Sequence, residues 1–253
     1  MAVTEEILPM ALPHRFRNFE ELSESQKDER FHNYHYVNLK AKNLRPLLRE
    51  KFNPVLKSCG FSRTSDTLFS RKVEPHYVHC LRLSFSSKSP GRFIVKAGVA
   101  LDILPLSDWS AFEMTRLSLD SDCLFTTNVL LSNGNPEFDN GTDLVEANET
   151  INYLISSFKD FDLNYFSQFD HFPKPIDRLE VEFVQRISAL VSKNSISEYG
   201  RFGATIQFLT LRLALIHKFL GNTKSSRKLL EFGLSNHELF SLKSRYKDLL
   251  QSL

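Results

Sequence analysis

The sequence predicts an α+β protein: an antiparallel β-meander of about four strands, with an N-terminal helix before it and a C-terminal α-helical lobe after it. Three observations predict this fold class. An apolar stripe of helical period comes first, two stretches of alternating apolar and polar residues follow, and further stripes of helical period fill the rest of the chain. These changes of period indicate an irregular or helical region at residues 1–36, a sheet domain at 37–140 and a helical lobe at 141–253.

The helix before the sheet is predicted from apolar residues that recur at three- and four-residue steps. They are Leu44, Leu48, Phe52, Val55, Leu56 and Cys59. Pro54 is expected to kink or interrupt this helix, because proline lacks the amide hydrogen that the helical ladder uses. Gly60 is expected to end it, since glycine is common just after the last helical turn.

Two strands are predicted at residues 77–85 and 93–103, where the odd positions are mainly apolar. The even positions include a polar set, Arg82, Ser84, Lys96 and Asp102. Successive side chains of a strand point to opposite faces, so we expect one buried face and one wet face that carries this set. Further strands are expected at 67–73 and 123–131, and the short connections between neighbours favour a meander.

The remainder of the chain is expected to be helical from Asp143 onward. Apolar stripes begin at Leu144 and Ile176, and they are separated by a proline-rich break. The stretch at 202–220 is apolar nearly all round, which predicts a central, buried helix. Two shorter helices are expected after it.

Charge is distributed unevenly, although the formal net charge is only +2. Residues 102–182 contain 4 Lys and Arg against 16 Asp and Glu, whereas the segments before and after them are basic. Two interpretations stay open: the fold brings opposite charges together, or an acidic face meets a basic partner. No segment is long and apolar enough to span a membrane, and three scattered cysteines without a secretory signal favour a cytoplasmic protein.

Two stretches of the sequence resemble the markers of a known protein family. CGFSRTSDTLFSR, at residues 59–71, and FIVKAGVALDILP, at residues 93–105, resemble the markers of a bacterial family known only as a domain of unknown function. In that family a helix ends in Gly-Phe, a strand with an aromatic residue and an arginine follows, and the next strand contains glycine. The resemblance spans residues 43–131 and implies an α+β fold in a bacterial cytoplasm, with no catalytic residues to carry over.

Few residues are candidates for chemistry. His32 and His35 would be neighbours on a helix, at a spacing used for acid–base chemistry, and Asp102, Asp108 and Glu113 follow the second clear strand. The alternatives are ordinary surface roles, such as a helix cap at Asp108. We expect no metal site and no cofactor, because no zinc-like ligand spacing and no phosphate-binding loop is present.

The absence of a catalytic constellation and the uneven charge favour a non-enzymatic protein whose partner is another protein, such as a bacterial immunity or defence-associated factor. The polar set Arg82, Ser84, Lys96 and Asp102 is the predicted partner-binding surface. An uncharacterised hydrolase or nuclease that uses the candidate histidines and carboxylates is one alternative. A nucleic-acid-binding protein that uses its basic helices is another, though a net charge near zero does not favour it.

Overall fold

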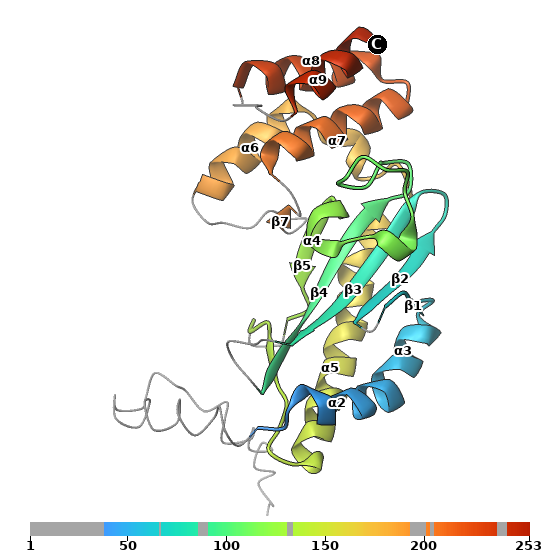
Figure 1. Cartoon of the computed structure of the whole chain (residues 1–253), viewed down its shortest axis with the longest axis vertical. Coiled ribbons are helices and arrows are strands. Elements are labelled where there is room, and N and C mark those ends of the chain that lie inside the picture. The colour runs from blue at the N-terminus through green and yellow to red at the C-terminus, as the bar shows by residue number, and fades with distance from the viewer. Residues whose placement is uncertain are drawn as a thin grey trace, which may run out of the picture.

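The computed structural model describes residues 38–65, 67–85, 91–130, 134–192, 201–202, 205–236 and 242–253. Within them, one antiparallel sheet is backed along its length by a long helix, and a helical lobe lies at one end of the molecule (Figure 1). The predicted α+β class, with a helix before the sheet and a helical region after it, is therefore confirmed. The two candidate histidines His32 and His35 lie outside the described residues.

The helix before the sheet consists of three consecutive segments. They are α2 (Ala41–Leu47), a π-helical turn (Leu48–Phe52) and α3 (Asn53–Ser58). Pro54 lies in the first turn of α3, directly after the π-helical turn, where its missing amide hydrogen costs least; the hydrogen-bonding pattern of the helix changes there, and the three segments follow one another without a gap. Gly60, just beyond α3, has a φ of 83°, a backbone conformation that favours glycine.

In the described residues the sheet contains seven strands, and all their pairings are antiparallel. They are β1 (Ser62–Arg63), β2 (Leu68–Val73), β3 (Tyr77–Phe85), β4 (Arg92–Leu101), β5 (Phe125–Asn128), β6 (Glu137–Asp139) and β7 (Arg201–Phe202). The order β1-β2-β3-β4-β5-β7 contains the predicted meander, and β6 continues the line of β5 along β4. Strands β1, β6 and β7 were not predicted, because two or three residues are too few to show alternation.

One face of the sheet packs on α5 (Leu144–Asn164), which runs behind the strands in Figure 1. The Asp143 side chain begins this helix by accepting hydrogen bonds from two backbone amides of the first turn. Phe158 of α5 meets Phe52 edge-on, with 5.6 Å between ring centroids, so the helix before the sheet shares this core.

The other face of the sheet is only partly wet, which corrects the expectation of one-sided burial. Val78, Cys80 and Ala100 are buried beneath the segment between β4 and β5, which contains η4 (Met114–Arg116) and α4 (Leu119–Asp122). These even positions are small or apolar, so the covering segment can approach closely. The rest of this face, towards Ser84, is half-buried.

The helical lobe follows α5. It contains η5 (Phe166–Phe169), η6 (Ile176–Arg178), α6 (Val181–Ser192), α7 (Ile206–Phe219), α8 (Thr223–Asn236) and α9 (Lys243–Gln251). Most of α7 is buried, as expected for the central helix. Its Arg212 side chain donates a 2.6 Å hydrogen bond to the Asp122 carbonyl, which ties the lobe to the segment that covers the sheet. No helix in the described part of the chain has the length and apolar character to cross a membrane.

Candidate functional site

A groove lies between α5 and the outer edge of β5, with a volume of about 400 Å³. We call it the α5–β5 groove. Its lining comprises Thr127, Asn128, Leu130, Tyr153, Ser156, Ser157, Asp160, Phe161, Asn164 and Tyr165. The size falls within the range of sites that hold small ligands or side chains of a partner.

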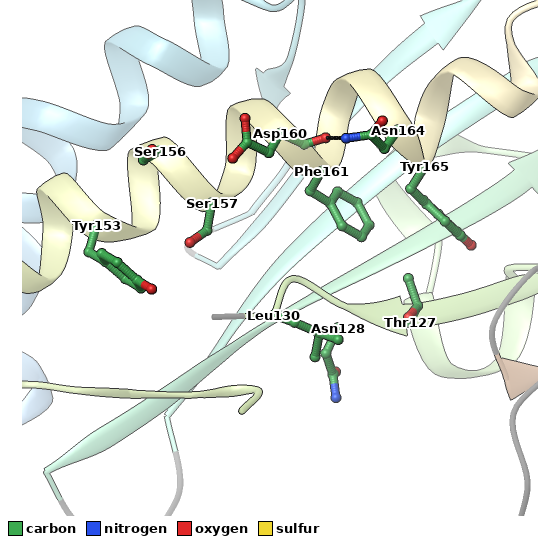
Figure 2. A pocket seen from close by; sticks show the side chains of 10 residues that line it. All are labelled: Thr127, Asn128, Leu130, Tyr153, Ser156, Ser157, Asp160, Phe161, Asn164 and Tyr165. Atoms are coloured by element: carbon green, nitrogen blue, oxygen red, sulfur yellow. Dashed lines mark hydrogen bonds between the residues drawn. The ribbon is translucent and has the colours of Figure 1, made fainter. Parts of the chain in front are cut away.

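The walls of the α5–β5 groove combine aromatic rings with hydroxyl groups. Figure 2 shows Phe161 and Tyr165 directed from α5 towards Thr127, while Ser157 and Tyr153 flank the same opening farther along the helix. Burial raises the pKa of the Tyr165 phenol far above its usual range, so the group stays neutral. Asp160, which is exposed, is the charged side chain of the lining.

The strand wall of the α5–β5 groove presents backbone groups as well as side chains. Asn128 pairs with Lys96 of β4, and the next residue, Val129, donates its amide to Val95. Hydrogen-bonded and non-hydrogen-bonded pairs alternate in an antiparallel ladder, so the amide and carbonyl of Asn128 point away from β4. Among the described residues, β7 pairs with this outer edge only as far as Thr126.

Exposed apolar side chains gather around the same helix. Six large hydrophobic residues of the described chain are exposed, and five of them lie on α5 or in the groove: Leu130, Leu144, Val145, Tyr153 and Leu163. Val145 and Leu163 are about five helical turns apart and therefore lie on the same side of α5. Val145, Tyr153 and Leu163 fall outside the buried stripe of α5, and their apolar character at these positions is the signal in the sequence that could have located this surface.

The predicted partner surface on the sheet is partly occupied by ion pairs. Arg82 and Lys96, on neighbouring strands, both contact the Asp120 carboxylate, at 2.7 and 3.1 Å. Ser84 lies beyond them and is half-buried. The covering segment therefore supplies an acidic partner to two of the four residues, which alternation alone does not reveal.

Asp102, which was expected both in the partner surface and among the candidate acids, lies at a different point of the sheet. Its carboxylate contacts His76 Nδ1 at 2.9 Å and Lys72 Nζ at 3.1 Å, and its amide donates to the His76 carbonyl. His76 is also edge-on to the rings of Phe172 and Phe219. This cluster joins the turn between β2 and β3 to the end of β4 and to the helical lobe.

The other two candidate acids each have a local partner. Asp108 binds the Arg116 guanidinium and the Ser110 hydroxyl, and these contacts hold its pKa below the usual range, the Ser110 bonds contributing most. Glu113 accepts a hydrogen bond from Thr115. No contact joins these two carboxylates to Asp102, and none of the three lines the α5–β5 groove.

His79 and Arg71 form a buried polar cluster beneath the sheet that the sequence did not predict. The Arg71 guanidinium donates to His79 Nδ1 at 3.1–3.2 Å and pairs with the Asp162 carboxylate at 2.7 Å. The opposite ring nitrogen of His79 lies 3.2 Å from the Phe169 carbonyl, so the neutral ring donates there. Burial, with the Arg71 charge beside it, lowers the pKa of His79 to about 3. His79 is fully buried, the Arg71 and Asp162 side chains are 15% and 18% exposed, and the cluster ties β2 and β3 to α5 and η5.

Two further expectations concern metals and basic helices. No three His, Cys, Asp or Glu side chains of the described residues are placed to hold a metal ion. The basic helices α2–α3 and α8–α9 lie at opposite ends of the long axis, so they do not form one continuous surface (Figure 1).

Comparisons with protein-family models, curated proteins and solved structures find no match for this chain.

Proposed function

We propose that this protein is a non-enzymatic protein-binding module and that its partner docks on the outward side of α5 and the α5–β5 groove. The observation that carries the proposal is that five of the six exposed large apolar side chains of the described residues lie along α5 or in the groove. Single exposed apolar residues are ordinary, whereas several on one helix beside a groove are typical of an interaction surface. Tyrosine in the lining agrees with this, since tyrosine is enriched at protein interfaces.

The surface offers a test through Leu163, whose side chain is 73% exposed. The purified chain is mixed with candidate partners, namely toxins and the products of neighbouring genes, and complexes are detected by size-exclusion chromatography with light scattering. Leu163→Ser should weaken a complex about five- to thirtyfold, since truncating a central contact costs roughly 1–2 kcal/mol.

The control is Lys247→Ser, which truncates an exposed side chain on α9 of the helical lobe. It should leave the affinity unchanged. A complex that both variants weaken equally, or that neither weakens, would contradict docking on α5. The expectation of an immunity or defence role is addressed by the same experiment, because it predicts a toxin among the partners.

The alternative of a hydrolase has one observation in its favour, the contact between His76 and Asp102. A carboxylate that accepts the Nδ1 hydrogen leaves Nε2 of the imidazole as a base, the arrangement that many hydrolases use. Hydrolysis of activated esters and of single-stranded RNA is compared for the wild type and His76→Gln. Turnover that the substitution abolishes would support this alternative, and the absence of turnover in the wild type would reject it.

A further inference from the structure

We propose that the α5–β5 groove binds an extended, basic peptide segment of a partner protein, which adds to the outer edge of β5 as a further strand. This inference rests on the proposed function and specifies how the partner binds. A strand edge beside a helix is a recurring peptide-binding geometry, in which main-chain hydrogen bonds supply affinity and side-chain pockets supply specificity.

Within the described residues, the β5 edge offers at Asn128 the backbone groups that such pairing needs. The amide and carbonyl of Asn128 point away from β4, and no other described strand pairs with them. The same edge already accepts a strand, because β7 pairs antiparallel with Phe125 and Thr126. An added peptide would continue this pairing along the strand wall of the groove.

The opposite wall fits an aliphatic side chain of the peptide. Phe161 and Tyr153 project from α5 into the opening, and Leu130, 47% exposed, lies at its strand side (Figure 2). In a strand, every second side chain points to the same face. One aliphatic residue of the peptide would therefore lie against these rings while its neighbours point away from α5.

The charge of the groove wall favours a basic peptide. Asp160 is exposed at the groove, and α5 carries three further acidic residues, Glu146, Glu149 and Asp162, against one basic residue, Lys159. Asp162 is neutralised by Arg71, but Asp160 has no ion-pair partner in the described part of the chain. A lysine or arginine of the peptide would supply the missing positive charge.

The experiment begins with a phage-displayed library of linear peptides of about ten residues, selected on the full chain. We expect enrichment of peptides that combine an aliphatic residue with lysine or arginine a few positions away. The affinity of a fluorescently labelled, selected peptide is then measured by polarisation for the wild type and for four variants.

Two variants test the strand edge, and two test the charge. Asn128→Pro removes the amide hydrogen that points outward and breaks no hydrogen bond to β4. Because proline is tolerated on an edge strand, the sheet should persist. The peptide should bind to this variant about tenfold more weakly, since one main-chain hydrogen bond is lost. Asn128→Ala keeps the amide and is its control. Asp160→Asn should weaken binding about threefold, and Glu149→Gln, outside the lining, is the matched control.

A second measurement does not depend on the folding of Asn128→Pro: amide hydrogen exchange of the wild type, with and without the peptide. The selected peptide should slow exchange of the Asn128 amide. No enriched peptides, acidic peptides, or unchanged exchange at Asn128 would overturn the proposal. So would a dimer of the chain that Asn128→Pro dissociates, because a second copy would then occupy the edge.

These outcomes separate the two proposals. If Leu163→Ser weakens a partner complex but Asn128→Pro does not, the protein binds its partner through α5 without strand addition. If both variants leave every complex intact, the proposed function fails as well.

Discussion

The buried imidazole of His79 should make the stability of this protein depend steeply on pH, and His79→Gln should remove that dependence. In the folded chain the pKa of His79 is lowered to about 3, from an ordinary value of 6.5, by burial and by the Arg71 charge. The unfolded chain therefore binds a proton as the pH falls through the ordinary value, while the folded chain does not until about pH 3.

The sign and size of the effect follow from this difference. The stabilisation is complete above pH 6.5 and is lost progressively as the pH falls towards 3. One proton changes the free energy of unfolding by about 1.4 kcal/mol per pH unit, so lowering the pH from about 7.5 to about 4.5 should cost about 2.5 kcal/mol through His79.

Urea unfolding, followed by circular dichroism at both pH values, measures the effect. The wild type should lose about 2.5 kcal/mol more than His79→Gln between the two conditions, since other titrating groups are common to both proteins. His171→Gln, which removes an exposed histidine, should follow the wild-type curve. A difference below about 0.5 kcal/mol between the wild type and His79→Gln would refute the reasoning, because the ring would then be free to ionise in the folded chain.

Three further substitutions test the packing of the fold, each by urea unfolding. A Cβ at Gly98 would lie 2.6 Å from Cys123 Sγ, so Gly98→Ala should destabilise the protein by about 2 kcal/mol; no loss would mean that the covering segment is loosely packed. Arg212→Ala should lower the free energy of unfolding by about 3 kcal/mol, because it leaves the buried Asp122 carboxylate without its cation. Arg212→Met should lower it less, since methionine keeps the packing of the aliphatic part of the arginine side chain. Asp143→Ala should cost about 1 kcal/mol by removing the cap of α5, and a loss near zero would show that water replaces the cap.

The sequence predicted the fold where a single period runs over many residues. The strand expected at 77–85 is β3, and the strand expected at 93–103 is β4 shifted by one or two residues. The wet face could not be predicted in the same way. Val78 and Cys80 are covered by a segment more than twenty residues later in the chain, and alternation within one strand carries no information about such cover.

The candidate site was predicted only in its general character. An acidic middle segment suggested a face for a basic partner, and Asp160 of the α5–β5 groove belongs to that segment. The position of the groove depends on the early end of β5 at Asn128, while the fourth strand was expected to continue to residue 131. The contact of Asp102 with His76 likewise joins residues that only the antiparallel pairing of β3 and β4 brings together.

The pairing of β5 with β7 bears on the order in which the chain is completed during synthesis. The meander of β2, β3 and β4 joins neighbours in sequence and can form as soon as β4 leaves the ribosome. Arg201 and Phe202, which cover the first half of the β5 edge, are made only after α5 and α6. The edge beside the groove is therefore the last to gain its neighbour, and nascent chains are most open to strand exchange or to chaperones at that edge.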